Sequence, residues 1–226
     1  MDKLLSSIKI EVPSGIYLKD PETSALGKKI IENSIIQIEA MGFEDFNFKK
    51  LGQFIGSNES SIYRYFESKH KLLIYLSSWY WSWIEYQLVI ETFSIHKPKD
   101  KLYKAIEVVT RTTKQDNNYS HINEVLLNTI IINENSKSYL TKDVDSGNKE
   151  GHFMPYKKVI QRLSEIISTF NCSYAYPLSL ASTIVESALH QQFIKIHFKS
   201  ITNCSELITP TQFFQDLTFK TLLHDK

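Results

Sequence analysis

The chain has 226 residues, of which only 7 are Gly and 6 are Pro, about half of what average usage would give, so we expect few tight turns and long elements rather than a β-sandwich or barrel. An apolar fraction of 42% and a charged fraction of 23% exclude a disordered, collagen-like or low-complexity chain. The net charge of +1 gives no sign of a nucleic-acid partner.

The first predicted helix follows an N-terminal arm, residues 1–22. From Thr23 to Met41, apolar residues recur at every third or fourth position, which is typical of an amphipathic helix. Either Thr23 or Ser24 can cap the start of this helix, and Gly42 suits the left-handed position that ends one.

Two short helices and a long one are predicted next. Asn47 can cap the first short helix, which stops at Gly56, and Asn58 can cap the second, Glu59–Phe66. Ser68 then caps a long helix, whose wide apolar stripe indicates burial on more than one side.

The rest of the chain is predicted to form further helices, over Lys99–Lys114, His121–Glu134, Pro155–Phe170, Pro177–Lys199 and Pro210–Leu223. The polar stretch 133–151 is expected to contain a loop. With about nine helices and no convincing interior strand, the predicted fold class is all-α.

Several features argue against secretion, metal binding and catalysis. Cys172 and Cys204 have no CxxC or Cys/His ligand spacing, so we expect neither a disulfide framework nor a zinc site. The most apolar window, Ile74–Ile90, falls short of a membrane span, and the first ten residues lack the apolar run of a signal peptide. No GxSxG, P-loop, GxGxxG or HExxH motif is present. We therefore expect a soluble cytoplasmic protein that is not an enzyme and carries no metal and no cofactor.

The stretch Gly42–Leu73 carries the functional signal. Two short helices joined by a turn at Gly56 and preceded by a longer support helix form a helix-turn-helix arrangement. In such a unit the second helix enters the major groove of DNA, and in this sequence that helix is Glu59–Phe66.

The residue types on this reading helix fit DNA. Small hydroxyl side chains allow close approach to base edges, while Tyr63, Arg64 and Tyr65 can reach phosphates. Glu59 can accept a hydrogen bond from a cytosine amino group, or it is a first-turn carboxylate favoured by the helix dipole. The predicted DNA-binding residues are Asn47, Lys49, Asn58, Glu59, Ser60, Ser61, Tyr63, Arg64, Tyr65, Lys69 and His70.

The run from Asn47 to Leu73 resembles the DNA-binding signature of tetracycline-repressor-like (TetR-like) regulators. The family pattern is a cap residue, a short helix ending at Gly, a second helix finishing in Tyr-x-x-Phe, and then x-Ser-Lys-x-x-Leu-Leu. Positions that match without a gap are Asn47, Gly56, Ile62, Tyr63, Phe66, Ser68, Lys69, Leu72 and Leu73. Gly52 departs from the pattern, because the family usually has Ala there.

The resemblance implies a homodimer that binds a near-palindromic DNA operator, acts as a repressor and is released by a small apolar or aromatic ligand. It implies a helix-turn-helix domain over 23–70 and an effector-binding and dimerisation domain over 71–226. Tyr63 and Lys69 would contact phosphates.

The resemblance also places the dimer contact and the ligand pocket. The last two helices, about 177–199 and 210–223, would pair with their mates in a four-helix bundle. The side chains expected along the pairing sides are Leu180, Ile184, Ala188, Gln191, Gln192, Phe213, Phe214, Leu217 and Leu222. Candidate walls of the ligand pocket are Trp79, Trp83, Tyr86, Tyr103 and Phe193.

A second function remains open, namely a helical dimer that binds a small molecule or a protein without sequence-specific DNA binding. Residues 24–73 contain seven Lys and Arg against six Asp and Glu, so the predicted DNA-binding part is only weakly positive. The acidic Glu59 on the predicted reading helix also favours this alternative. The cluster around Trp79 and Trp83 is either part of the core or a wall of the ligand pocket.

Overall fold

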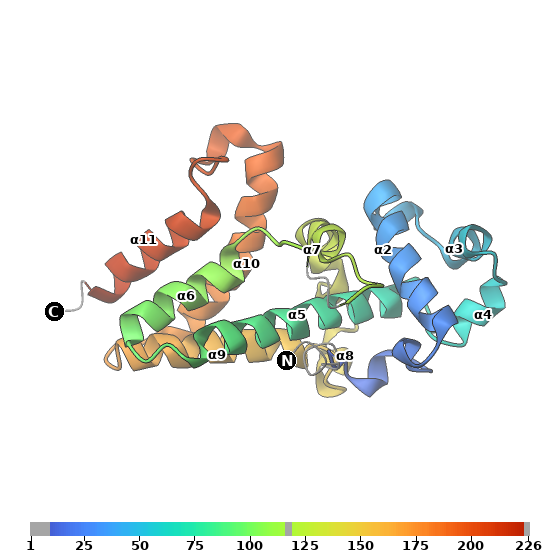
Figure 1. Cartoon of the computed structure of the whole chain (residues 1–226), viewed down its shortest axis with the longest axis horizontal. Helices are drawn as coiled ribbons and strands as arrows, with labels where there is room; N and C mark the ends of the chain where they lie inside the picture. Colours follow the sequence, from blue (N-terminus) through green and yellow to red (C-terminus); the bar gives the residue numbers. More distant parts are fainter. Residues whose placement is uncertain (1–9, 116–118, 224–226) are drawn as a thin grey trace. The chain divides into compact units, whose positions relative to one another are not determined.

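The computed structural model describes residues 10–115 and 119–223, and the regular elements in these ranges are all helices, which confirms the all-α prediction (Figure 1). The α-helices are α2 (Ala25–Asp45), α3 (Phe48–Ile55), α4 (Glu59–Tyr63), α5 (Lys69–Phe93), α6 (Pro98–Thr110), α7 (Glu124–Tyr139), α8 (Val144–Lys149), α9 (Met154–Phe170), α10 (Pro177–His197) and α11 (Pro210–Leu223). Three short 3₁₀ helices are η1 (Ser14–Ile16), η2 (Pro21–Thr23) and η3 (Lys199–Ile201).

Several element boundaries differ from the prediction; for example, α6 ends at Thr110 rather than Lys114, and α7 runs over Glu124–Tyr139 rather than His121–Glu134. The stretch 133–151 contains the predicted loop, at residues 140–143, but it also holds the last turns of α7 and all of α8. Helix α4, which is predicted to read DNA, ends at Tyr63, three residues earlier than predicted. Gly42 interrupts α2 with φ 78° and ψ 157°, a conformation that suits Gly because it has no Cβ.

The chain divides into two compact units. The first contains the residues up to Ser82 together with Thr113–Pro155, and the second contains Trp83–Thr112 and Tyr156–Lys226. The boundaries fall inside α5 and α9. Helices α7 and α8 therefore belong with the helix-turn-helix, whereas the predicted domain boundary near residue 70 separates them.

In the first unit, α2 is the central support of the helix-turn-helix. Its apolar stripe of Ile30, Ile31, Ile35 and Ile38 is buried. Helix α2 packs against both α3 and α7, which lie far apart in the sequence. Ser24 caps its start, as one of the two predicted alternatives, because the Ser24 hydroxyl accepts a hydrogen bond from the Gly27 N–H at 3.1 Å.

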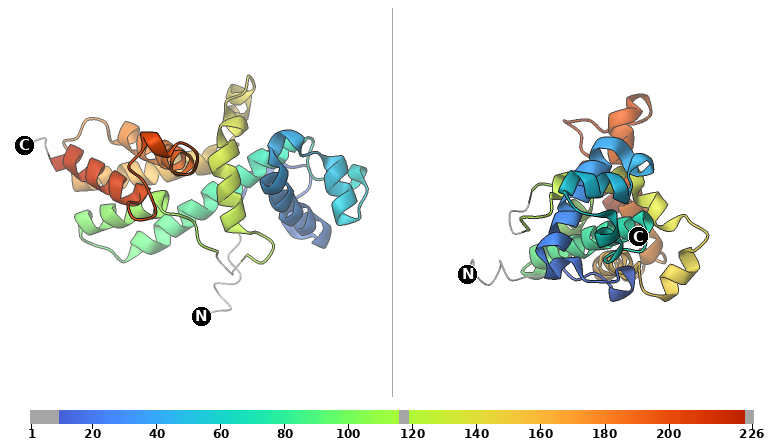
Figure 2. Two further views of the ribbon diagram at one scale, coloured as in Figure 1. Left: turned by 90° about the horizontal axis from the view of Figure 1, so that it is seen from above. Right: turned by 90° about the vertical axis from the view of Figure 1, so that its right-hand side faces the viewer.

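In the second unit, α6, α10 and α11 pack against one another (Figure 2). Much of the side predicted for dimer pairing is instead the core of this unit, and the buried residues are Leu180, Ile184, Ala188, Gln192, Phe214 and Leu222. The apolar residues that α10, η3 and α11 expose are Leu178, Ile196, Phe198, Ile201, Phe213, Leu217 and Leu223. Of the predicted pairing residues, Phe213 and Leu217 are therefore exposed. In the described residues, no helix has the length and apolar character needed to cross a membrane.

Candidate nucleic-acid interface

Local hydrogen bonds build the helix-turn-helix as the sequence predicts. The Asn47 Oδ1 accepts from the Lys50 N–H at 2.9 Å, and the Asn58 Oδ1 accepts from the Ser60 N–H at 3.2 Å. Between the two helices, Gly56 has φ 64° and ψ 38°, the left-handed conformation that closes a helix. Asn47 thus sets where α3 begins, Gly56 sets where it ends, and Asn58 sets where α4 begins (Figure 1).

Close contact between α3 and α4 depends on Gly52. A Cβ atom at this position would lie 2.9 Å from the Ser57 carbonyl oxygen and 3.3 Å from the Glu59 nitrogen. The absence of a side chain at Gly52 therefore lets the start of the reading helix lie directly against α3.

Most of the predicted DNA-binding side chains are accessible, on α4 and at the start of α3. Asn47, Lys49, Asn58, Ser60, Tyr63 and Arg64 are exposed, and Glu59 and Ser61 are partly accessible. The Tyr63 side chain is 47% exposed, although its ring packs edge-on against Phe48 with the centroids 5.0 Å apart. A Tyr held in this way has a fixed ring and an accessible surface, which suits a contact with a phosphate.

Tyr65 and His70 have protein partners instead. Tyr65 was predicted to be exposed, but it is buried, and its hydroxyl lies 2.8 Å from the Ser24 hydroxyl. The His70 Nε2 lies 3.0 Å from the Lys137 carbonyl oxygen of α7. Tyr65 therefore connects the chain after α4 to the start of α2, and His70 connects the start of α5 to α7. Residues 24–73, which contain the helix-turn-helix, form the head of the first unit.

Lys69 also has protein partners. Its Nζ donates to the carbonyl oxygens of Phe43, Glu44 and Phe46 at 3.0, 2.9 and 3.1 Å. These carbonyl groups lie at the carboxyl end of α2, where the helix dipole favours a cation such as the Lys69 ammonium group. The predicted phosphate contact of Lys69 stays a prediction, and it would have to compete with these three acceptors.

Two further lysines of the head bind carbonyl oxygens in the same way. The Lys29 Nζ donates to the Ile55 carbonyl at 2.8 Å, and the Lys50 Nζ donates to the Asp45 carbonyl at 2.7 Å. Part of the positive charge of this unit is thus used to close the ends of α2 and α3.

Helix α7 also contacts the carboxyl end of α2. The Glu134 Oε1 accepts from the Phe43 N–H at 3.3 Å, and the Lys137 Nζ binds carboxylate oxygens of both Glu44 and Glu134, at 2.9 and 2.8 Å. Hydrogen bonds to Glu134 and Glu44 raise the pKa of Lys137, and the bond to Lys137 lowers the pKa of Glu44. Nothing in the local sequence pattern indicates the contacts with Phe43 and Glu44, because these two residues lie about 90 positions from their partners on α7.

Comparisons with known proteins identify the fold. No protein-family model matches the sequence, and no curated protein matches it. AibR, in a crystal structure with isovaleryl coenzyme A and operator DNA, is 18% identical with a TM-score of 0.54, over 85% of this chain and 95% of that one. The superantigen PfiT is 13% identical with a TM-score of 0.61, over 92% of this chain and 100% of that one.

A third similar structure is a protein from Saccharomonospora viridis, described as a transcriptional regulator and in complex with choline. It is 13% identical with a TM-score of 0.57, over 89% of this chain and 98% of that one. At these identities the likeness concerns the fold alone. The fold is thus one that transcriptional regulators and a superantigen share, and function has to be argued from the site.

The predicted ligand-wall residues have separate surroundings. Trp79 and Trp83 are each 1% exposed, and the Trp79 ring packs edge-on against Tyr119 with the centroids 5.3 Å apart. Tyr86 is partly accessible. Phe193 packs along α10 between His190 and His197, with ring centroids 6.4 and 4.5 Å away.

Tyr103, the fifth predicted wall residue, lines an open groove of about 470 Å³ between α6 and α11. Its ring stacks on Phe219 with the centroids 6.2 Å apart, and its carbonyl oxygen accepts from the Gln215 amide at 3.2 Å. This groove belongs to the second unit, as does Phe193.

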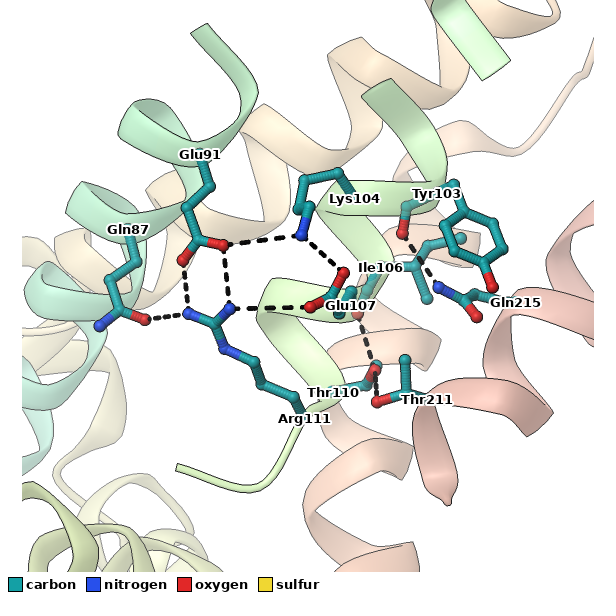
Figure 3. Close-up of polar contacts among 10 residues, drawn as sticks. All are labelled: Gln87, Glu91, Tyr103, Lys104, Ile106, Glu107, Thr110, Arg111, Thr211 and Gln215. Carbon is teal, nitrogen blue, oxygen red and sulfur yellow. Dashed lines mark hydrogen bonds and ion pairs between the residues drawn. The ribbon is translucent and has the colours of Figure 1, made fainter. Parts of the chain in front are cut away.

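Polar contacts lock α6 to its neighbours near Tyr103 (Figure 3). Arg111 forms two hydrogen bonds with the Glu91 carboxylate, at 2.9 and 2.5 Å, and a third with the Gln87 side-chain oxygen at 2.7 Å. One residue earlier, the Thr110 hydroxyl lies 3.0 Å from the Thr211 hydroxyl of α11. The carboxyl end of α6 is therefore fixed to both α5 and α11.

Proposed function

We propose that the chain is a DNA-binding transcriptional regulator that responds to a small molecule. The observation that carries the proposal is the accessible surface around α4, where a glycine-closed turn and two Asn caps present hydroxyl, amide, Tyr and basic side chains together. That combination suits a reading helix in the major groove, which has room for one α-helix.

Within this proposal the side chains divide into two groups. Ser60 and Ser61 on α4 approach base edges, because short hydroxyl side chains allow the helix to lie close to the bases. Tyr63 and Arg64 follow on the same helix end and contact phosphates, as Asn47 and Lys49 do from the start of α3. Phosphate contacts set the register of the helix, and base contacts set the sequence that it prefers.

The proposed regulator acts as a homodimer on a near-palindromic operator and represses transcription. Support for a second copy comes from the apolar residues that α10, η3 and α11 expose, among them Phe198, Phe213 and Leu217. Two reading helices of a dimer occupy half-sites about 34–36 Å apart. A homodimer interface that buries these side chains would set the distance between the two reading helices.

The proposed effector is a small apolar or aromatic molecule. Of the similar proteins, AibR binds isovaleryl coenzyme A together with operator DNA, and the protein from Saccharomonospora viridis binds choline. An effector that binds more tightly to an arrangement in which the two reading helices do not fit the operator shifts the population away from the DNA-binding arrangement. Within the first unit, the contacts of Glu134 and Lys137 with the end of α2 provide a route from α7 to the head.

The test begins with selection from a random duplex library at low salt, which should enrich an inverted repeat. Tyr63→Ala should then weaken binding to the enriched duplex and leave its salt dependence unchanged, since the neutral tyrosine hydroxyl gives up a hydrogen bond to phosphate but releases no counterion. Tyr176→Ala is the matched control, because Tyr176 is an exposed tyrosine of the second unit, 67% accessible. An equal loss in both variants, or no loss in either, would count against the site.

A second candidate function is a helical dimer that binds a small molecule or a protein without sequence-specific DNA binding. Glu59 at the start of α4 and the near balance of seven basic against six acidic residues in 24–73 favour it. The superantigen PfiT shows that the fold also occurs in a protein of another kind. Failure to enrich any duplex at low salt would support this alternative.

A further inference from the structure

The N-terminal segment 17–24 is attached to Tyr65, two residues after the end of α4. The Leu18 N–H donates to the Tyr65 carbonyl oxygen at 2.8 Å, and the Ser24 hydroxyl lies 2.8 Å from the Tyr65 hydroxyl. The Lys19 Nζ lies 5.1 Å from the centroid of the same Tyr65 ring. Three contacts from one short segment thus meet at a single residue, one at its backbone and two at its buried side chain.

The segment is a firmly packed part of the first unit. Pro21 lies so close to α2 that a Cβ on Gly27 would be 2.2 Å from the Pro21 carbonyl oxygen. On the other side, Glu22 accepts a hydrogen bond from the His121 Nε2 at 2.7 Å. The Ile16 side chain, just before the segment, is 1% exposed. The backbone that carries Lys19 is therefore held at both ends.

Lys19 adds positive charge next to the predicted phosphate-contacting end of α4. Tyr65 directly follows Arg64, and Tyr63 and Arg64 are both exposed. Lys19 is exposed as well, and the hydrogen bonds of the Tyr65 hydroxyl, first with Ser24 and then with Lys19, lower the pKa of this tyrosine. By contrast, Lys29, Lys50 and Lys69 of the head donate to carbonyl oxygens.

We propose that Lys19 is a further phosphate contact of the DNA-reading head, held beside the carboxyl end of α4 by the segment 17–24. This inference rests on the DNA binding proposed above. A helix in the major groove directs its first residues at the bases, and elements beside its other end meet the sugar–phosphate backbone. A lysine there reads no sequence, so it contributes to specific and non-specific binding alike.

The experiment compares three variants of the full chain by fluorescence anisotropy. Lys19→Met keeps an apolar stem over the Tyr65 ring but removes the charge, and Lys19→Arg keeps the charge. Lys99→Met is the matched control, because Lys99 is an exposed lysine at the start of α6 in the second unit. The probes are labelled duplexes of about 30 bp, one of random sequence and one enriched by selection, titrated between about 50 and 200 mM salt.

Lys19→Met should bind both duplexes about eightfold more weakly per protomer near 0.1 M salt, and its log–log salt slope should fall by roughly 0.9 per protomer, because one counterion fewer is released. Lys19→Arg and Lys99→Met should behave like the unsubstituted chain. All three variants should have the same unfolding midpoint as the unsubstituted chain, since Lys19 and Lys99 are both exposed.

Two results would overturn the inference and leave the proposed function intact. The first is a Lys19→Met variant with unchanged affinity and slope on a duplex that the unsubstituted chain binds. The second is an equal loss in Lys19→Met and Lys19→Arg without a change in slope, which would indicate a packing role only. No binding of either duplex by the unsubstituted chain would overturn both proposals together.

Discussion

Gly52→Ala tests how closely the reading helix approaches its neighbour. The added Cβ would stand 2.9 Å from the Ser57 carbonyl oxygen, whereas ordinary contacts begin at 3.4 Å. The turn that precedes α4 would therefore have to move by about 0.5 Å, and the atoms in the way belong to the backbone. The Asn58 cap lies within the same turn.

The magnitude follows from two opposed effects. Replacing Gly by Ala inside a helix favours folding by about 1 kcal/mol. Overpacking a close contact costs about 1–3 kcal/mol. Because the obstacle is backbone rather than a flexible side chain, we expect the cost to exceed the gain and the free energy of unfolding to fall by about 1 kcal/mol. Sequence resemblance alone would suggest a harmless change, since TetR-like regulators usually carry Ala here.

The assay is urea-induced unfolding combined with amide hydrogen exchange over residues 57–63. Gln53→Ala is the matched control, because Gln53 is the next residue of α3 and is exposed. We expect Gly52→Ala to lower the unfolding midpoint and to speed exchange at the start of α4, and Gln53→Ala to do neither. A midpoint raised in Gly52→Ala, with unchanged exchange in α4, would refute the reasoning.

Two further predictions concern a buried histidine and an ion pair. Burial first, and then the nearby Lys71 charge, lower the pKa of His152. As the pH falls, the unfolded chain therefore takes up a proton on this histidine at about pH 6.5, whereas the folded chain does so only at a lower pH. The free energy of unfolding consequently decreases as the pH falls below about 6.5. His152→Asn should flatten the decline of the urea midpoint between about pH 7.5 and 5.5, and an equally steep decline in the variant would contradict this reading. Arg111 and Glu91, with side chains 31% and 30% exposed, should show a coupling of about 1 kcal/mol in a double-mutant cycle with Arg111→Met and Glu91→Gln. A coupling near zero in urea unfolding would show that their two hydrogen bonds add no stability.

The features that the sequence predicts well are local. Asn47, Asn58 and Ser68 cap helices because each side chain needs only a backbone N–H two or three residues further along. Gly56 ends α3 because Gly readily adopts a left-handed conformation. Helix α8 was missed for a related reason, since it buries no side chain and so has no apolar stripe.

The features that the sequence could not predict depend on distant partners. The stripe of Leu180 and Ile184 on α10 indicates a buried face, but periodicity does not say whether a neighbour in the same chain or a second copy covers it. Tyr65 and Lys69 have the residue types of phosphate contacts, yet their partners are 23–41 residues away in the chain. The role of Lys19 depends on a hydrogen bond that spans 47 positions, from residue 18 to residue 65.

The three lysines that bind carbonyl oxygens in the head affect how the proposed regulator would locate its operator. Because the ammonium groups of Lys29, Lys50 and Lys69 donate to carbonyl oxygens of the protein itself, they keep their charge but fewer of them are placed for direct contact with the phosphates of arbitrary DNA. Sliding along DNA requires such sequence-independent attraction. The protein would then spend little time on non-specific sites and reach its operator mainly by repeated collisions from solution. Operator occupancy would depend closely on the number of protein copies in the cell.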